Sequence, residues 1–297
     1  MERGYSARMR IASSRLGLLC LLFAAALPGQ SNKQKKQGKQ SKEPAAAVPG
    51  PAKDDPTTKK DKAVAALDAF LASHAPNTKS DGWRTQMAEP PQQSFPEDRD
   101  YYWRFATNKG ELKIRLLPQV APMHCTSAIY LTRAGFYDGL SFHRVIKGFM
   151  AQGGCPNSTG SGNAGFTMKG ETSEAVKHDK AGLISTANED GKEKTDGSQF
   201  FLTFAPCPHL DGKHTIFGEV VEGMETVTAM DALGGEGESQ KPTEPITITR
   251  AWIEVVAKDG AATDDDAKKD GKPSEKPKKA DSSSKPKKPA GDAKKQG

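Results

Sequence analysis

A cation stands among apolar residues in the stretch from Phe142 to Gln152, and this is where the chain best combines groups that could do chemistry. The stretch reads Phe-His-Arg-Val-Ile-Lys-Gly-Phe-Met-Ala-Gln. Because alternate residues of a strand share a face, Arg144 and Gln152 can lie beside apolar side chains. Burying a guanidinium without a partner is costly, so this arrangement indicates a site that binds polar groups. A salt-bridged structural arginine is the alternative interpretation.

Two later stretches repeat the combination. Ser198-Gln199-Phe200-Phe201-Leu202 predicts a strand with a glutamine beside paired aromatic residues. Leu210-Asp211-Gly212-Lys213-His214 predicts a turn that delivers a histidine to the next strand. With the stretch Leu-Ile-Ser-Thr-Ala-Asn at 183–188, these segments closely resemble the cyclophilin family of peptidyl-prolyl isomerases. The resemblance covers about residues 98–258 and is to a bacterial-like member, while the composition of the two ends of the chain predicts an exported protein with low-complexity tails.

The resemblance implies a set of site residues, each at a position that matches the family's motifs. The implied catalytic residues are Arg144, Phe149, Gln152 and His214, and the implied substrate-binding residues are Met150, Ala187, Asn188, Gln199, Phe201, Leu210 and His209. The apolar members are expected to hold a proline ring. Arg144 is expected to donate to the prolyl nitrogen as the amide loses resonance in the transition state. By strand alternation, the neighbouring His143 and Phe200 are expected to face the interior.

His209 departs from the pattern of the best-known family members, which carry tryptophan immediately before Leu-Asp-Gly-Lys-His. In those proteins the tryptophan donates its indole N–H to cyclosporin and covers the ligand with apolar surface. An imidazole is smaller, so we expect weaker inhibition by cyclosporin in this chain. Prolyl turnover is expected to survive, because neither proline burial nor donation by Arg144 depends on position 209.

Other chemistries fit less well. Residues 160–165 match the dinucleotide pattern G-x-G-x-x-G, but the pattern needs a strand before it and a helix after it, and the flanks here read as loop. His209, Asp211 and His214 lie in one turn without a fourth metal ligand, and the chain has no Cys-x-x-Cys pair. We therefore expect neither a metal nor a cofactor. His178 is interpreted as a plain loop residue.

The pattern of elements predicts a mainly β fold. Short strands are expected at 100–107, 111–117, 182–187, 198–204, 214–221 and within 245–256, a strand pair broken at Lys147-Gly148, helices at 122–133 and near 224–231, and a long loop at 153–170. Many short strands with closely spaced turns favour a closed β-barrel. The resemblance implies that the barrel is eight-stranded, antiparallel and capped by two α-helices.

Composition divides the chain into four parts. Residues 1–29 carry four arginines ahead of an apolar run that is short for a membrane span, which predicts a secretory signal peptide; an uncleaved anchor is the alternative. Residues 30–97 read as a Lys/Pro-rich linker with a short helix near 63–71, dispensable for catalysis. Residues 98–258 form the predicted isomerase domain, and residues 259–297 form a Lys/Pro/Asp tail that is expected to be disordered. The protein is thus expected in the periplasm or outside the cell, without a membrane span after cleavage.

The basic character of the chain belongs to its ends. The net charge is +6, yet residues 63–257 hold 24 acidic and 18 basic residues. The pI is therefore no argument for nucleic-acid binding by the folded part. We expect a monomer that acts on proline-containing polypeptides. The alternatives are a proline-peptide adaptor or holdase that works through its basic tails, and tails that bind acidic polymers.

Three cysteines would remain after signal cleavage, namely Cys125, Cys155 and Cys207. An odd number leaves at least one thiol unpaired within the chain. Cys125 falls in a predicted helix and is interpreted as a small buried residue. Cys155 and Cys207 fall in predicted loops, where a disulfide between them stays an open alternative.

Overall fold

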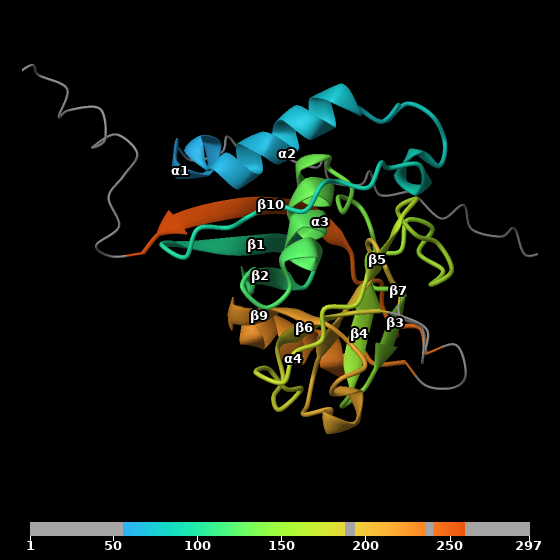
Figure 1. Ribbon diagram of the computed structural model, residues 1–297. Coiled ribbons are helices and arrows are strands. Elements are labelled where there is room, and N and C mark those ends of the chain that lie inside the picture. Colours follow the sequence, from blue (N-terminus) through green and yellow to red (C-terminus); the bar gives the residue numbers. More distant parts are fainter. Residues whose placement is uncertain (1–55, 188–193, 236–239, 259–297) are drawn as a thin grey trace, which may run out of the picture. The chain divides into compact units, whose positions relative to one another are not determined.

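A computed structural model describes residues 56–187, 194–235 and 240–258 (Figure 1). The described residues all belong to one compact unit. The helices are α1 (Pro56–Lys60), α2 (Lys62–Ser73), α3 (Pro122–Arg133), α4 (Met224–Ala232) and the short 3-10 helices η1 (Trp83–Thr85) and η2 (Pro208–Leu210). The predicted signal peptide and C-terminal tail lie outside the described residues.

Ten strands are described. They are β1 (Arg99–Thr107), β2 (Gly110–Leu116), β3 (Arg144–Ile146), β4 (Met150–Gly153), β5 (Thr167–Lys169), β6 (Leu183–Thr186), β7 (Lys194–Asp196), β8 (Phe200–Thr203), β9 (Ile216–Glu222) and β10 (Ile248–Ala257). Eight of them form one sheet in the order β10-β1-β2-β9-β6-β8-β4-β3, and β5 pairs with β7. Every neighbouring pair is antiparallel. The predicted mainly β, antiparallel architecture is confirmed.

The segment before β3 hydrogen-bonds to the start of β10 and to the residues just before it. The Phe142 N–H donates to the Ile246 carbonyl at 2.9 Å, and the Ile248 N–H donates to the Leu140 carbonyl at 2.8 Å. An antiparallel bridge joins Ser141 and Thr247 between them. These bonds satisfy backbone groups that an open sheet edge would leave to solvent. A closed barrel nevertheless stays a prediction, because the main sheet ends at β10 and β3.

An aromatic cluster in the main core joins β1, β8 and the segment after α3. Trp103 on β1 is fully buried, and its ring centroid lies 4.5 Å from that of Phe105 and 5.0 Å from those of Tyr137 and Phe200. Edge-to-face pairs at these distances add to the free energy gained from burial alone. Phe200 faces the interior, as predicted from strand alternation.

The segment before β1 belongs to the folded domain, so the predicted boundary at residue 98 is too late. Ala63, Val64 and Leu67 of α2 are buried in the main core cluster, together with Met87 and Phe95. An amphipathic helix this short is marginal alone, and burying its apolar face stabilises it. Figure 1 shows α2 lying beside α3, and the two helices are in contact. The boundary was predicted wrongly because the segment is mostly polar, although its few apolar residues are spaced so that they can pack in the core.

A buried carboxylate at the start of α2 fixes this segment to the sheet. Asp61 caps the helix by accepting from the Val64 N–H at 3.0 Å, and it accepts from the Tyr101 hydroxyl at 2.7 Å. The Arg99 guanidinium lies 3.6 Å from the same carboxylate. A buried carboxylate with these partners is satisfied, whereas one without them would be strongly destabilising.

Within the described residues, no helix is long and apolar enough to cross a membrane.

The β5–β7 pair lies within a region that was predicted in part as a long loop. β5 spans residues 167–169 of the predicted loop 153–170 and pairs with residues 194–196. Strands of three residues show no usable alternation, and their pairing depends on contacts distant in sequence. This small sheet forms one wall of a cavity described below.

Candidate active site

Three neighbouring strands place the polar and aromatic candidates in one row. Arg144 on β3 pairs with Gln152 on β4, and Gln152 pairs with Phe201 on β8. Directly opposed residues of an antiparallel sheet share a face, so these three side chains point to the same side. The predicted break between the two short strands, at Lys147-Gly148, is confirmed.

The turn between β3 and β4 is held from the side by α4. Gly148 adopts a φ of 68°, which glycine reaches at little cost. Its N–H donates to the Asp231 carboxylate of α4 at 2.6 Å. The turn therefore sets the relative positions of Arg144 before it and Met150 after it.

An apolar cluster separate from the main core lies next to this row. Met150, Phe201, Cys207 and Leu210 form it, with Ile146 and Phe149 packed against them. Met150, Phe201 and Leu210 are only 2%, 5% and 9% exposed, whereas Phe149 is half-buried. An apolar wall outside the core is the usual form of a pocket for a small apolar group.

His178 anchors the turn that carries Leu210 and His214, a role that no local sequence pattern predicts. Its backbone N–H and its Nδ1 lie 2.8 and 3.0 Å from the Asp211 carboxylate, and its Nε2 lies 3.1 Å from the Ser185 hydroxyl. The ring also stacks on Phe201 with centroids 6.2 Å apart. Burial lowers the pKa of His178, while the hydrogen bond with Asp211 opposes that shift. His178 is thus a buried structural residue and not a plain loop residue.

Two histidines border the apolar cluster. The His214 Nδ1–H donates to the Thr186 carbonyl at 3.0 Å, and its ring stands edge-on to Phe201 with centroids 5.4 Å apart. His209 lies over Phe149 at a centroid distance of 5.6 Å. His209 is exposed and therefore lies at the rim of the apolar cluster.

These side chains enclose a cavity of about 390 Å³. Its lining brings together nine of the eleven candidate residues and adds Lys213: Arg144, Phe149, Met150, Gln152, Ala187, Phe201, His209, Leu210, Lys213 and His214. Gln199 does not line it, and Asn188 lies outside the described residues. Lys213 is the residue that sequence reasoning missed, and its place in the Leu-Asp-Gly-Lys-His turn was the available signal.

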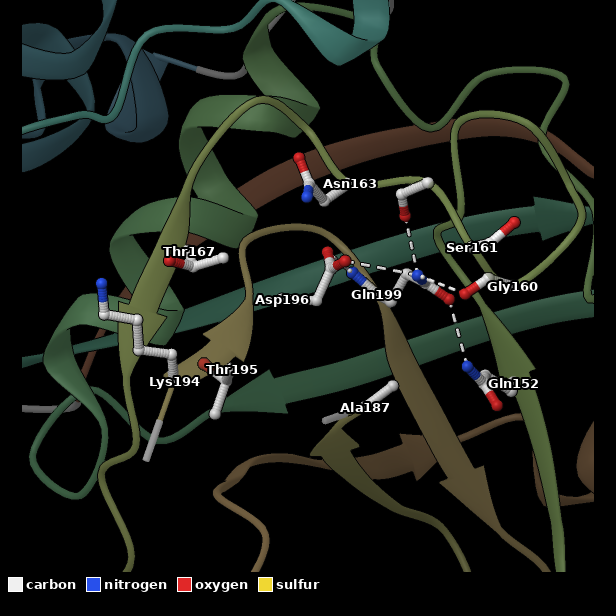
Figure 2. Close-up of a pocket in the computed structure, with 11 residues that line it drawn as sticks. Gln152, Gly160, Ser161, Asn163, Thr167, Ala187, Lys194, Thr195, Asp196 and Gln199 are labelled. Carbon is white, nitrogen blue, oxygen red and sulfur yellow. Dashed lines mark hydrogen bonds between the residues drawn. The ribbon is translucent and has the colours of Figure 1, made fainter. Parts of the chain in front are cut away.

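A second cavity of about 430 Å³ adjoins the first, and Gln152 and Ala187 line both. Figure 2 shows Gln199 between Gln152, Gly160 and Asp196. The Gln152 amide donates to Gln199 at 3.1 Å, and the Gln199 amide donates to the carbonyls of Gly160 and Gly162 at 3.0 and 2.7 Å. Gln199 is therefore placed to orient Gln152 and not to touch a ligand in the first cavity.

The glycine-rich loop at 160–165 binds protein groups. The Gly160 and Gly162 N–H groups donate to the Cys155 sulfur at 3.3 and 3.4 Å. Although burial alone would raise it, the pKa of Cys155 is lowered, because these and other backbone N–H groups favour the thiolate. Strand β5, and not a helix, follows this loop, so the loop offers no helix N-terminus to a phosphate.

Burial sets the electrostatics around Arg144. Partial desolvation lowers the pKa of Arg144, but a guanidinium stays charged at any physiological pH. Burial, and then the neighbouring Arg144 charge, lower the pKa of His143 to about 4, so this imidazole is neutral at pH 7. Both His143 ring nitrogens are buried, and neither has a hydrogen-bond partner among the described residues. His143 thus adds no second charge beside Arg144.

The other candidate chemistries find no support in the part of the chain that the structure describes. There, no group of three histidine, cysteine or carboxylate side chains is arranged to hold a metal ion. Cys125, Cys155 and Cys207 are all buried and free, so the disulfide left open between Cys155 and Cys207 is not formed. The expectation of a site without a metal or cofactor stays a prediction.

The chain is similar to known proteins of one family. The family described as cyclophilin type peptidyl-prolyl cis-trans isomerase/CLD matches residues 102–253. The peptidyl-prolyl cis-trans isomerase-like 1 of Gibberella zeae is 43% identical over 150 residues, which cover 50% of this chain and 91% of the relative. The peptidyl-prolyl cis-trans isomerase B of Bacillus subtilis is 48% identical over 116 residues, which cover 39% of this chain and 80% of the relative.

Other relatives are much longer than the matched region. The chain spans 29% of the length of the peptidyl-prolyl cis-trans isomerase-like 2 of Cryptococcus neoformans var. neoformans, with 38% identity over 168 residues and 55% of this chain covered. Among solved structures, a cyclophilin type peptidyl-prolyl cis-trans isomerase of Cryptosporidium parvum matches with a TM-score of 0.50 and 34% identity. That match covers 52% of this chain and 98% of the solved chain.

Proposed function

The chain belongs to the cyclophilin-type peptidyl-prolyl cis-trans isomerase family, and on that premise we propose that it isomerises X-Pro bonds in polypeptides by a non-covalent mechanism. One observation carries the proposal: the Arg144 guanidinium lines the same cavity as the apolar residues Phe149, Met150 and Phe201. A proline ring needs an apolar pocket, and a twisting amide needs a donor beside it.

The proposed mechanism lowers a barrier that comes from amide resonance. Rotation about a peptide bond costs about 18–20 kcal/mol, so the uncatalysed reaction takes tens of seconds or more. The apolar cluster would hold the proline ring and exclude water from the amide. Arg144 would donate to the prolyl nitrogen, whose lone pair becomes available only as resonance is lost. A bond made chiefly in the transition state raises kcat and does not merely tighten binding.

We propose proline-containing polypeptides as substrates and a monomer as the working state. Arg144, the apolar cluster and the His214 turn all come from one chain, so a second subunit is not needed to complete the site. Gln152 and Ala187 line both cavities, and a peptide extended from the first would reach the second. The Ala187 N–H already donates to the Gln199 carbonyl at 3.1 Å. Any backbone pairing with substrate would therefore use the Ala187 carbonyl, which accepts from the Asp196 N–H at 3.4 Å and has a second lone pair.

We further propose a closed barrel and an exported, bacterial-like protein that assists the folding of proteins in the periplasm or outside the cell. The hydrogen bonds between the Phe142 and Ile246 segments support closure of the sheet. The arginines and short apolar run within residues 1–29 support export.

A protease-coupled assay on a short X-Pro peptide tests the proposed activity. The protease cleaves only the trans form, so the slow phase reports isomerisation. We expect the full chain at nanomolar to micromolar concentration to accelerate that phase in proportion to its concentration. A proline-peptide adaptor or holdase would bind the peptide and leave the slow phase unchanged, and that result would reject the isomerase.

Replacing His209 with tryptophan is expected to tighten inhibition by cyclosporin at least about tenfold, equivalent to about 1.4 kcal/mol. The larger ring would stand at the pocket mouth beside Phe149 and supply an indole N–H that imidazole lacks in that position. Inhibition titrations of the native and His209→Trp proteins measure the change, and His209→Phe separates the apolar contact from the donated hydrogen bond. The value of kcat/KM on a short peptide should change little. Equal inhibition of the native and tryptophan proteins would show that His209 does not occupy the ligand-covering position.

A further inference from the structure

We propose that Gln240 is a positioning residue, which holds the Arg144 guanidinium in the orientation needed for donation to the substrate. This inference rests on the proposed function of Arg144. The Arg144 Nε–H donates to the Gln240 side-chain oxygen at 2.6 Å. A charge-assisted hydrogen bond of that length is among the stronger polar contacts in proteins.

Gln240 is itself fixed against the strand that carries Arg144. The Val145 N–H donates to the Gln240 backbone carbonyl at 2.8 Å, and the Val145 carbonyl accepts from the Gly235 N–H at 3.1 Å. Both backbone groups of Val145, the residue after Arg144, are thus hydrogen-bonded at the edge of β3, one to Gln240 and the other to Gly235. The backbone of Gln240 therefore fixes the residue beside β3, and its side chain accepts the hydrogen bond from the Arg144 Nε–H.

The backbone of Gln240 adopts a left-handed conformation that costs free energy in a residue with a side chain. Its φ is 49°, and within the described residues Ser158 is the other non-glycine residue with a positive φ. Such conformations persist only where surrounding contacts impose them, and they cluster at functional sites. Glycine would adopt this φ freely but would supply no side-chain acceptor. The strained backbone conformation thus occurs at a residue whose side-chain oxygen accepts the hydrogen bond from Arg144.

The guanidinium is held at two points on different sides. Gln240 accepts from Nε–H, and on the other side Gln152 lies 3.5 Å from the Arg144 Nη1. Among contacts within the described residues, these engage two of the five N–H groups of the fork. The remaining donors belong to the two terminal nitrogens of a side chain that lines the cavity. Fixing a long side chain before the substrate binds removes an entropic cost from the catalytic step.

The test removes the acceptor while keeping the length of the side chain and the backbone conformation. Gln240→Met is expected to lower kcat/KM about tenfold, mainly through kcat, since misplacing a catalytic group by even 1 Å can cost up to about a hundredfold. Gln240→Glu keeps an oxygen acceptor and should stay within about threefold of wild type. Gln240→Gly removes the acceptor and the backbone strain together, and it should be as slow as Gln240→Met. Gln119→Met is the matched control, because Gln119 is a glutamine outside both cavities that donates to the Phe95 carbonyl.

A spectroscopic readout separates positioning from a general structural role. In NMR spectra, the Arg144 Nε–H of wild type, Gln240→Glu and Gln119→Met should be shifted downfield and protected from exchange with water. That signature should vanish in Gln240→Met and Gln240→Gly, while the amide spectrum of the remaining domain is preserved. Wild-type turnover in Gln240→Met, or loss of activity with the Nε–H signature intact, would overturn the inference. Full activity in Arg144→Ala would instead reject the proposed mechanism itself, so the two failures are distinguishable.

Discussion

Replacing Arg144 with alanine is expected to lower kcat/KM on an X-Pro peptide by about two to three decades, because losing one preorganised donor typically costs about 3–4 kcal/mol. The loss should appear mainly in kcat, since the bond to the prolyl nitrogen forms as the amide twists. The apolar cluster that includes Met150 and Phe201 is left in place, so peptide binding should weaken much less. Protease-coupled kinetics together with a direct measurement of peptide affinity separate the two effects.

Arg144→Lys is the informative control. A lysine keeps the charge, but it lacks the planar fork that reaches Gln240 and Gln152 at the same time as the substrate. We expect it to rescue little of the lost activity. Near-wild-type turnover in Arg144→Ala, with an unchanged near-UV circular dichroism spectrum, would reject the proposed role of the arginine.

The sequence predicted best those elements that local chemistry defines. Pro122 at the start of α3 and Gly135 just past its end punctuate a helix, and the alternation of Leu112, Ile114 and Leu116 defines the buried face of β2. The row of Arg144 and Gln152 follows from the same alternation once the turn at Gly148 is recognised. In these cases the relevant neighbours lie within a few residues along the chain.

Contacts between distant segments explain what the sequence did not predict. Gln240 lies 96 residues from Arg144, and Asp211 lies 33 residues from His178. Nothing in the local pattern marks either pair, because each residue alone looks like a polar loop residue. The role of Gln199 also depends on distant segments. Its motif predicted a substrate-binding residue, but in the fold its amide donates to the carbonyls of Gly160 and Gly162.

The N-terminal segment was misjudged on its composition. Residues 76–97 hold four prolines and three glutamines, yet Phe95 packs edge-on against Tyr101 with ring centroids 5.0 Å apart. Linker composition lowers the average hydropathy without preventing single apolar residues from docking in a core that other segments form. The domain therefore includes a segment that supplies few core residues but is tied to the sheet and to α3.

Removing residues 1–97 is expected to abolish stable folding, against the sequence-based expectation that residues 30–97 are dispensable. The deletion takes Leu67, Met87 and Phe95 out of the core, and fully burying each such side chain contributes about 1.5–3 kcal/mol. It also leaves the buried Tyr101 hydroxyl without its Asp61 acceptor, at a further cost of about 1–3 kcal/mol. The sum approaches the whole stability of an ordinary domain, about 5–15 kcal/mol. Circular dichroism and urea unfolding of residues 98–297 measure the outcome.

Point variants and a shorter truncation test whether the loss of stability comes from α2 and not from the shorter chain. Leu67→Ala should lower the free energy of unfolding by about 2–5 kcal/mol, because Leu67 is fully buried and its truncation leaves a cavity. Lys62→Ala on the same helix is the matched control and should change stability by less than about 0.5 kcal/mol, since Lys62 is exposed. Truncation to residues 56–297 keeps α1, α2 and every described contact, so it should fold and turn over peptide like the full chain. If residues 98–297 instead unfold cooperatively with a stability within about 1 kcal/mol of the full chain, then α2 packs on the domain without stabilising it.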